Sequence, residues 1–334
     1  MDGLPNLAQA AAGGVVTRPV RPNGAGYVQR INGAIDHVVR HLGEPLRLQD
    51  VARAAHFSPF HFHRIFHSLV GETVHDFVKR LRLERALTVM AQQRDAAAVA
   101  RAAGHARPPR RTLTQIALEC GFTSSADFSR SFRARFGAAP TRFDLARWQR
   151  ERRARMQAEL VPGEGHRLAG LPPGENPDGF QVRLQRVPAR RVAYLRVLRP
   201  YEGRGVAEAA LRLVRWARAR GLEGGQWLGY QWENPDVVEL EHCRYDVGLV
   251  VPHATVVDGE VNVAEFAPMT LAELDIAGPI ELEMRALDWL FRTWLPASGF
   301  VPDDQPCFEA WNGLPFAHGF QHFELRAQLP VVPA

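Results

Sequence analysis

Two arginines, Arg64 and Arg130, occupy matched positions in a pattern that the chain carries twice. The Arg guanidinium is a fork of N–H donors that can bond guanine O6 and N7 together, so such a pair could read base edges in DNA. His61, His63 and His67 surround the first arginine, and His63 with His67 has the i, i+4 spacing of zinc pairs. No Cys or carboxylate joins them on that face. We therefore expect no metal site and interpret the histidines as groove or surface residues.

The repeated pattern is a pair of short helices joined by a turn. One copy runs from Leu48 to Gly71 and the other from Leu113 to Gly137, with matching apolar positions at an offset of 65 before the turn and 66 after it. Ser58 and Ser124 stand where helix N-caps are expected. Two ordinary helical hairpins with solvated faces are the alternative, but matched outward arginines argue against it. Two helix-turn-helix motifs predict a protein that reads two stretches of DNA groove.

The residues that helical phase turns outward on the second helix of each copy are the candidate DNA contacts. Arg64 and Arg130 are expected to read bases, whereas Arg133 and Arg142 are expected to touch phosphate, which positions a protein without specifying sequence. Phe60 could rest against a thymine methyl group or pack on its neighbours. The predicted DNA-binding residues are Phe60, His63, Arg64, His67, Ser125, Ala126, Ser129, Arg130 and Arg133.

The net charge of +5 is divided unevenly along the chain. Residues 1–160 contain 25 Arg and Lys against 13 Asp and Glu, a net charge of +12, and residues 161–334 contain 16 against 23, a net charge of −7. A basic half followed by an acidic half indicates a nucleic-acid-binding domain joined to a domain with another task.

Cysteine usage and hydropathy indicate the cellular compartment in which the protein works. Cys120, Cys243 and Cys307 are widely spaced and form neither a disulfide framework nor a metal clip, which is typical of a reducing cytoplasm. The first residues lack the features of a signal peptide, and no run of 18 apolar residues occurs. We expect a cytoplasmic protein with no membrane partner.

Four regions follow from composition and periodicity. Residues 1–26 are rich in Ala, Gly and Pro and are predicted to be a disordered tail, and residues 27–150 form the tandem helix-turn-helix domain. A linker is placed at residues 151–179, because nine of the eighteen residues from Pro162 to Gly179 are Pro or Gly. Residues 180–332 form the second domain.

The second domain is predicted to be α+β and built from a repeat. Its residues show strand alternation, and landmarks recur at an offset of 78 or 79. The matched landmarks are Trp216 with Trp294, Gly221 with Gly299, Trp232 with Trp311, and Tyr245 with Phe323. Each unit reads strand, helix, strand, strand. The fold class expected is therefore an all-α tandem helix-turn-helix domain followed by an α+β domain of two pseudo-symmetric repeats with a groove between them.

The first half resembles the AraC/XylS-type transcription regulators from about Tyr27 to Arg147. The doubled motif carries the resemblance, together with the segment FGAAPTRFDLARW from Phe136. The resemblance implies base contacts at the matching positions of the two recognition helices, with double-stranded DNA as the partner.

The second half resembles the GyrI-like small-molecule-binding domain from Phe180 to about Val332. The motifs are RRVAYLR, CRYDVGLVVP, WLPASG, CFEAW and the terminal LPVV. Strand alternation puts Glu309 on the same face as Cys307 and Trp311. The resemblance implies that such a Glu lies at the bottom of a ligand pocket and pairs with cationic or polar groups.

The predicted ligand site centres on Glu309. A buried carboxylate needs compensation, so a pocket of aromatic residues that holds one favours cationic aromatic ligands. For each aromatic residue, packing in the core is the alternative to ligand contact. The predicted ligand-binding residues are Glu309, Trp311, Trp227, Tyr230 and Trp232.

The sequence therefore predicts a one-component transcription regulator without cofactor or enzymatic activity. A small effector in the C-terminal domain would alter either promoter binding or contact with RNA polymerase. One alternative is a hydrolase acting on electrophilic small molecules, with Glu309 as general acid or base. Another is an architectural DNA binder whose acidic domain binds protein.

Overall fold

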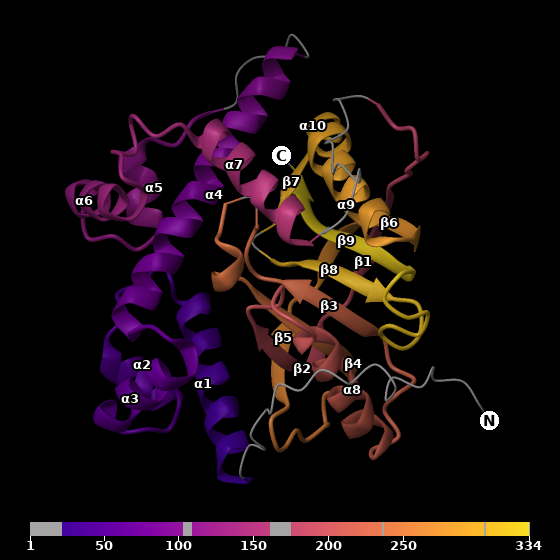
Figure 1. Cartoon of the computed structure of the whole chain (residues 1–334). Coiled ribbons are helices and arrows are strands. Elements are labelled where there is room, and N and C mark those ends of the chain that lie inside the picture. Colours follow the sequence, from indigo (N-terminus) through magenta and orange to yellow (C-terminus); the bar gives the residue numbers. More distant parts are fainter. Residues whose placement is uncertain (1–21, 103–108, 161–174, 236, 304, 334) are drawn as a thin grey trace. The chain divides into compact units, whose positions relative to one another are not determined.

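The chain divides into two compact units (Figure 1). The helical unit comprises the described residues of Gly26–Leu160 and Glu233–His242, and the sheet unit comprises the described residues of Val161–Trp232 and Cys243–Ala334. No helix of the described ranges is long and apolar enough to cross a membrane. The computed structural model describes residues 22–102, 109–160, 175–235, 237–303 and 305–333.

The helical unit contains two helix-turn-helix pairs joined by one long helix. The pairs are α2 with α3 and α5 with α6, and α4 runs between them. The elements are α1 (Pro22–Arg40), α2 (Leu48–Ala54), α3 (Pro59–Val70), α4 (Val74–Ala102), α5 (Leu113–Glu119), α6 (Ser125–Phe136) and α7 (Leu145–Leu160).

Both recognition helices begin and end with the same local chemistry. The hydroxyl oxygen of Ser58 accepts a hydrogen bond from the backbone N–H of His61, and that of Ser124 accepts one from Asp127 at 3.1 Å. Both predicted N-caps are therefore confirmed. Gly71 and Gly137 end the helices at φ of 89° and 77°, a left-handed conformation that glycine adopts without a Cβ clash.

Phenylalanines form the core of both motifs. Phe62 and Phe66 are fully buried with ring centroids 5.5 Å apart, and Phe66 meets Phe77 of α4 at 5.4 Å. In the second motif, Phe128 and Phe132 are equally buried and 5.5 Å apart. The core stripe of the repeated pattern thus packs alike in both copies.

A buried ion-pair network holds the N-terminal part of α4 to the turn after α3. Arg80 Nε donates to Glu72 Oε1 at 3.1 Å, and Arg80 Nη1 donates to Glu84 Oε2 at 3.0 Å. The Arg80 side chain is only 8% exposed, so each of its partners offsets part of its desolvation.

Two of the predicted regions have one wrong boundary each. Residues 22–26 belong to α1 and not to a tail, since proline is tolerated in the first turn of a helix. Residues 151–160 belong to α7 and not to a linker, because this stretch lacks Pro and Gly and consists mostly of strong helix formers. The rest of the predicted tail (residues 1–21) and of the Pro/Gly-rich segment (161–174) lies outside the described residues.

The sheet unit is one antiparallel sheet in the strand order β1-β6-β9-β8-β3-β4-β2-β5, with β7 paired to β9. Its strands are β1 (Arg183–Val187), β2 (Arg190–Leu198), β3 (Trp227–Gln231), β4 (Arg244–Val251), β5 (Asn262–Phe266), β6 (Met269–Gly278), β7 (Phe300–Pro302), β8 (Cys307–Trp311) and β9 (Phe323–Pro333). Its helices are α8 (Gly205–Arg218), α9 (Ile280–Trp289) and α10 (Leu295–Ala297).

The element order strand, helix, strand, strand occurs twice. The first set is β2, α8, β3, β4 and the second is β6, α9, β8, β9. The two sets meet where β3 pairs with β8, in the middle of the sheet. Residues of α8 and α9 share one apolar cluster with a single face of the sheet, which we call the helix-covered face.

One predicted match between the repeats is wrong. Trp311 belongs to the cluster on the helix-covered face, whereas Trp232 packs with the cluster on the opposite face. An odd error in register moves a residue to the other side of a sheet. Gly229 lies opposite Glu309, so these two residues share a face of the sheet. Equivalent residues of the two strands must also share a face, so their residue numbers differ by an even number and not by 79.

Candidate functional site

The predicted DNA-contact residues lie on the exposed side of α3 and α6. Phe60, His63, Arg64 and His67 are exposed on α3, and Phe60 is 68% exposed. A hydrophobic side chain this open is not packed on its neighbours as a core residue is. The Arg64 guanidinium lies 5.9 Å from the Phe60 ring centroid.

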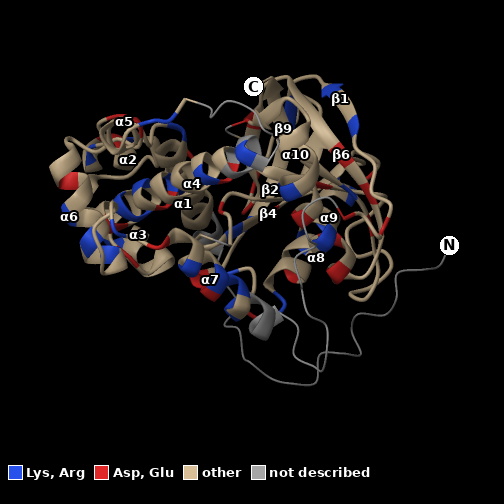
Figure 2. Cartoon of the chain, turned by 90° about the horizontal axis from the view of Figure 1, so that it is seen from above, with Lys and Arg blue, Asp and Glu red and all other residues tan. Residues whose placement is uncertain are grey.

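The second recognition helix is more cationic. Ala126, Arg130 and Arg133 are exposed, whereas Ser125 and Ser129 are partly buried. The Arg130 side chain is 73% exposed and lies 3.8 Å from Asp127, a weak pair that leaves it able to reach a ligand. Lys and Arg also line α4 and α7 of the same unit (Figure 2).

The histidines of α3 do not gather into a metal site. In the described part of the chain, only Glu239, Glu241 and His242 bring three ligand atoms of this kind together. Glu239 there is already paired with two guanidinium groups, those of Arg135 and Arg152.

These residues belong to a segment whose position in the fold was not predicted from the sequence. Glu233–His242 follows β3 and precedes β4, yet it clusters with the helical unit. Glu239 accepts hydrogen bonds from Arg135 of α6 and Arg152 of α7. The hydrogen bond with His242, together with the charges of these two arginines, lowers the pKa of Glu239 to about 2. A cleft of about 260 Å³ beside the segment is lined by Glu72, Asp76, Lys79, Arg80, Leu83, Ser131, Ala134, Arg135 and His242.

Glu309 lies at the centre of the sheet, on the helix-covered face. Its carboxylate accepts a hydrogen bond from the hydroxyl of Tyr245, and it faces Gly229 across the β3–β8 pair. A Cβ on Gly229 would overlap the Tyr245 hydroxyl and lie 2.9 Å from Glu309 Oε2. Glycine is therefore the residue that lets these two polar groups meet above the strand.

The surroundings of Glu309 favour its neutral form. Burial raises its pKa to about 7, and the hydrogen bond from Tyr245 opposes that rise in part. Burial also raises the pKa of Tyr245, with the nearby Glu309 charge adding to the effect, and raises the pKa of Cys307 to about 12. The carboxyl group thus titrates close to neutral pH, where a bound cation can take the place of its proton.

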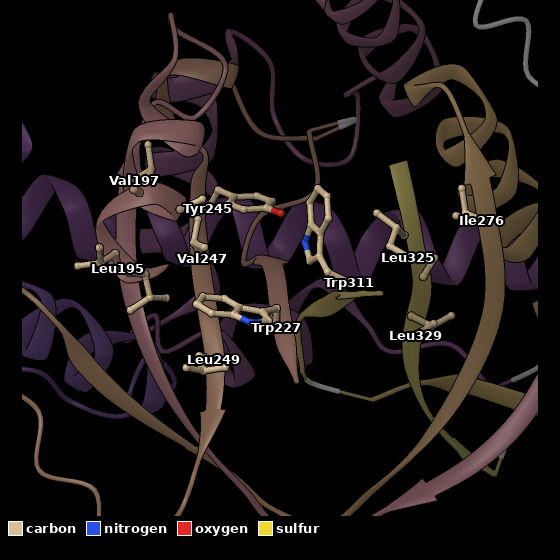
Figure 3. Packing of buried hydrophobic residues seen from close by; sticks show 14 of the residues in the cluster. Leu195, Val197, Trp227, Tyr245, Val247, Leu249, Ile276, Trp311, Leu325 and Leu329 are labelled. Carbon is tan, nitrogen blue, oxygen red and sulfur yellow. The ribbon is translucent and has the colours of Figure 1, made fainter. Parts of the chain in front are cut away.

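Two predicted aromatic residues share the face of Glu309. Trp227 and Trp311 belong to the apolar cluster of the helix-covered face, and Figure 3 shows the Trp311 ring beside the Tyr245 hydroxyl and the Trp227 ring nearer Leu249. The Trp311 side chain also hydrogen-bonds to Tyr245. The phenol ring of Tyr245 and the indole ring of Trp311 therefore lie on the same face as the Glu309 carboxyl group.

The other two lie on the opposite face, which corrects the prediction that they surround Glu309. Tyr230 pairs with Phe308 and not with Glu309, because side chains alternate along the strand. Tyr230 is fully buried in the cluster of Tyr194, Leu228 and Phe308. Trp232 donates its indole N–H to Asp246 at 2.7 Å, so its polar group already has a structural role.

Two residues of the site were missed. Tyr245 alternates with Val247 and Leu249 on one face of β4, and that alternation could have assigned it to the apolar face of its strand. Glu283 takes a position in the buried stripe of α9 together with Ala286, at i+3. A carboxylate in an apolar stripe is the signal that could have found it.

The family comparisons agree with both halves. Residues 180–317 match the family described as "GyrI-like small molecule binding domain", and residues 51–110 match a "Helix-turn-helix domain". A DNA gyrase inhibitor of Edwardsiella piscicida is 31% identical over 141 residues, which are 40% of this chain and 86% of that protein.

Relatives of the helical half carry regulator names. The probable transcriptional regulator LumQ of Photobacterium leiognathi is 28% identical over 120 residues, which are 35% of this chain and 42% of LumQ. A solved AraC-type regulator structure from Chromobacterium violaceum is 26% identical, with a TM-score of 0.28, over 35% of this chain and 90% of that one. This chain is accordingly a member of the AraC-type, DNA-binding transcription regulators that carry a C-terminal GyrI-like domain for a small-molecule ligand.

Proposed function

We propose that α3 and α6 read two successive stretches of major groove, with Arg64 and Arg130 as the base-reading residues. Both guanidinium groups are at outward positions of their helices, and Arg130 is largely exposed. Arg133 positions the protein through phosphate, and Phe60 contacts a thymine methyl group. A DNA target of this kind also implies a cytoplasmic location.

Replacing Arg64 or Arg130 with Ala should weaken binding to the cognate site by about 1–3 kcal/mol and relax one base position, because a bidentate guanine contact is lost. Binding titrations on cognate and random duplexes measure this. Arg133→Ala should weaken both duplexes equally and reduce the salt dependence. Arg53→Ala, exposed on α2, is the control. Equal losses on both duplexes for Arg64→Ala would make that residue a phosphate contact.

The C-terminal domain is proposed to bind a cationic aromatic ligand at Glu309. The observation that carries this proposal is the half-buried residue Glu309 on the helix-covered face, whose carboxyl group is held by Tyr245 beside Trp311. A cation above this group would compensate the buried charge, and the indole and phenol rings add cation–π attraction.

Glu309→Gln should weaken binding of the monocation 1-methyl-4-phenylpyridinium about tenfold or more at about pH 8, since the neutral amide offers no charge. Binding to the wild type should also strengthen about tenfold between about pH 6 and about pH 8. A raised pKa keeps the carboxyl neutral below about 7 and frees the anion above it. Isothermal titration of the full chain checks both expectations.

Glu223→Gln serves as the control, because Glu223 pairs with Arg218 at the surface of the same domain. Its affinity and pH profile should match the wild type. An unchanged affinity in Glu309→Gln, or a flat pH profile in the wild type, would contradict an electrostatic role for Glu309.

A second candidate function is acid–base catalysis in the same place. A carboxyl group that holds its proton near neutral pH and bonds a tyrosine hydroxyl has the properties of a general acid. Product formation from an electrophilic ring compound, abolished by Glu309→Gln, would establish it. We favour binding without turnover, since the relatives of the helical half are named as regulators.

Two further parts of the proposal concern architecture and output. The two strand-helix-strand-strand sets are proposed to be pseudo-symmetric halves that meet at the β3–β8 pair, which their matching strand order supports. Ligand binding would change either promoter affinity or contact with RNA polymerase. Promoter binding and transcription measured together, with and without the ligand, separate these outputs.

A further inference from the structure

Glu283 is a second carboxylate on the helix-covered side of the sheet unit. It is 4% exposed and lies on the face of α9 that also carries Ala286 and Leu290, at i+3 and i+7. That helix packs on β6 and β9, so an apolar side chain would be the usual occupant of the position. The charge at this place calls for a physical explanation.

The burial of Glu283 is not offset by the residues around it. Among the described residues, the Glu283 carboxylate makes no hydrogen bond and no ion pair. Arg285, two residues further along α9, is bound by Asp178 through two hydrogen bonds of 2.8 Å at the exposed side of the helix. A buried carboxylate without a compensating partner destabilises a fold, and a cationic ligand could relieve this effect.

The helix α9 packs on β9, and β9 pairs with β8, where Glu309 lies opposite Ala327 on the helix-covered face. Glu309 is therefore the second carboxylate on this side of the sheet. Burial and the charge of Glu309 raise the pKa of Glu283 well above its usual range. After burial, the charges of both carboxylates raise the pKa of Tyr245 on β4. The charge of Glu309 likewise adds to the rise that burial causes in the pKa of Cys307 on β8. No described Arg or Lys pairs with Glu283 or Glu309. The two acids therefore lie on the same side of the sheet, and neither has a described cationic partner.

We propose that Glu283 and Glu309 together form a dianionic subsite that prefers aromatic ligands with two cationic centres over those with one. This inference rests on the proposed binding role of Glu309 and extends it to Glu283. Each positive centre would take one carboxylate, while Tyr245 and Trp311 contact the ring system. A monocation would leave one carboxyl group buried in its protonated form.

The test compares two probes of nearly equal shape. 1-Methyl-4-phenylpyridinium carries one charge, and 1,1′-dimethyl-4,4′-bipyridinium carries two on the same biaryl framework. Isothermal titration of the full chain at about pH 8 should show about tenfold tighter binding of the dication, as expected for one more screened charge pair. Glu283→Gln should reduce the dication's affinity to that of the monocation and change the monocation's affinity by about twofold or less.

Two variants serve as controls. Glu281→Gln makes the same change of charge on the same helix and should keep the dication preference. Glu283→Leu places an apolar side chain in the buried stripe. It therefore tests whether the dication preference is lost when no polar group remains at position 283. Thermal unfolding of each variant verifies that it is folded before titration.

The outcomes are separable. Equal affinity of the wild type for the two probes, or a preference that survives Glu283→Gln and Glu283→Leu, would overturn the subsite. If the monocation binds and Glu309→Gln removes that binding, the proposed function stands even when the dication gains nothing. If neither probe binds, or Glu309→Gln changes neither, the proposed function and this inference fail together.

Discussion

Replacing Asp246 with Ala should lower the free energy of unfolding of the sheet unit by about 3–5 kcal/mol, because it removes the carboxylate that pairs with a buried guanidinium. Arg196 Nε and Nη2 donate to the two carboxylate oxygens of Asp246 at 2.8 and 2.6 Å, and the two side chains are 1% and 0% exposed. The indole N–H of Trp232 loses its acceptor as well. Urea unfolding followed by tryptophan fluorescence measures the loss.

The control uses the exposed pair of Arg212 and Glu260 in the same unit, whose side chains are 39% and 38% exposed. Glu260→Ala should change the free energy of unfolding by less than about 1 kcal/mol. The double variant Arg196→Met/Asp246→Leu should recover most of the loss, since it removes both charges together. Equal effects for Asp246→Ala and Glu260→Ala would show that burial of the first pair contributes nothing.

Local signals in the helical half were sufficient to predict its two helix-turn-helix motifs. Ser58 and Ser124 identified the starts of the recognition helices because an N-cap is satisfied by neighbours within three residues. Phe62, Phe66, Phe128 and Phe132 gave the core by helical periodicity alone. Such features depend on the residues beside them in the chain and not on distant partners.

The sheet half required information that a single strand does not contain. The pairing of β3 with β8 decides which of their residues share a face. The predicted offset of 79 between Trp232 and Trp311 is an odd number, whereas residues on the same face of these two strands differ by an even number. Without this pairing, nothing in the sequence separates Tyr230 and Trp232, on the opposite face, from Trp227 and Trp311, on the face of Glu309. Alternation within β8 was local, so the shared face of Cys307, Glu309 and Trp311 was predicted correctly.

Long-range packing could not be predicted from the sequence either. Nothing in the residues Glu233–His242 indicates that Glu239 would bind Arg135 and Arg152, more than eighty residues away in sequence. The partnership depends on the folded positions of α6 and α7. Similarly, Glu283 is identifiable as buried only when α9 is known to face the sheet.

Gly229→Ala should lower the free energy of unfolding by about 1–3 kcal/mol and also weaken cation binding about tenfold. The added Cβ would overlap the Tyr245 hydroxyl and lie 2.6 Å from Cζ of that ring, so Tyr245 must move. Its hydrogen bond to Glu309 opposes the rise in the pKa of that carboxyl. When this bond is lost, the pKa rises further and less carboxylate is present near neutral pH.

Two variants decide whether the clash with Tyr245 is the cause. Gly224→Ala is the matched control, because a Cβ there has no atom within 4 Å and should leave stability and affinity nearly unchanged. In Gly229→Ala/Tyr245→Leu the ring is gone, so the loss of stability should be smaller than the sum of the two single losses. If the losses add, Gly229 acts through the backbone of β3 and not through Tyr245. If Gly229→Ala binds the monocation as the wild type does, the Tyr245–Glu309 hydrogen bond does not control the charge that the ligand meets.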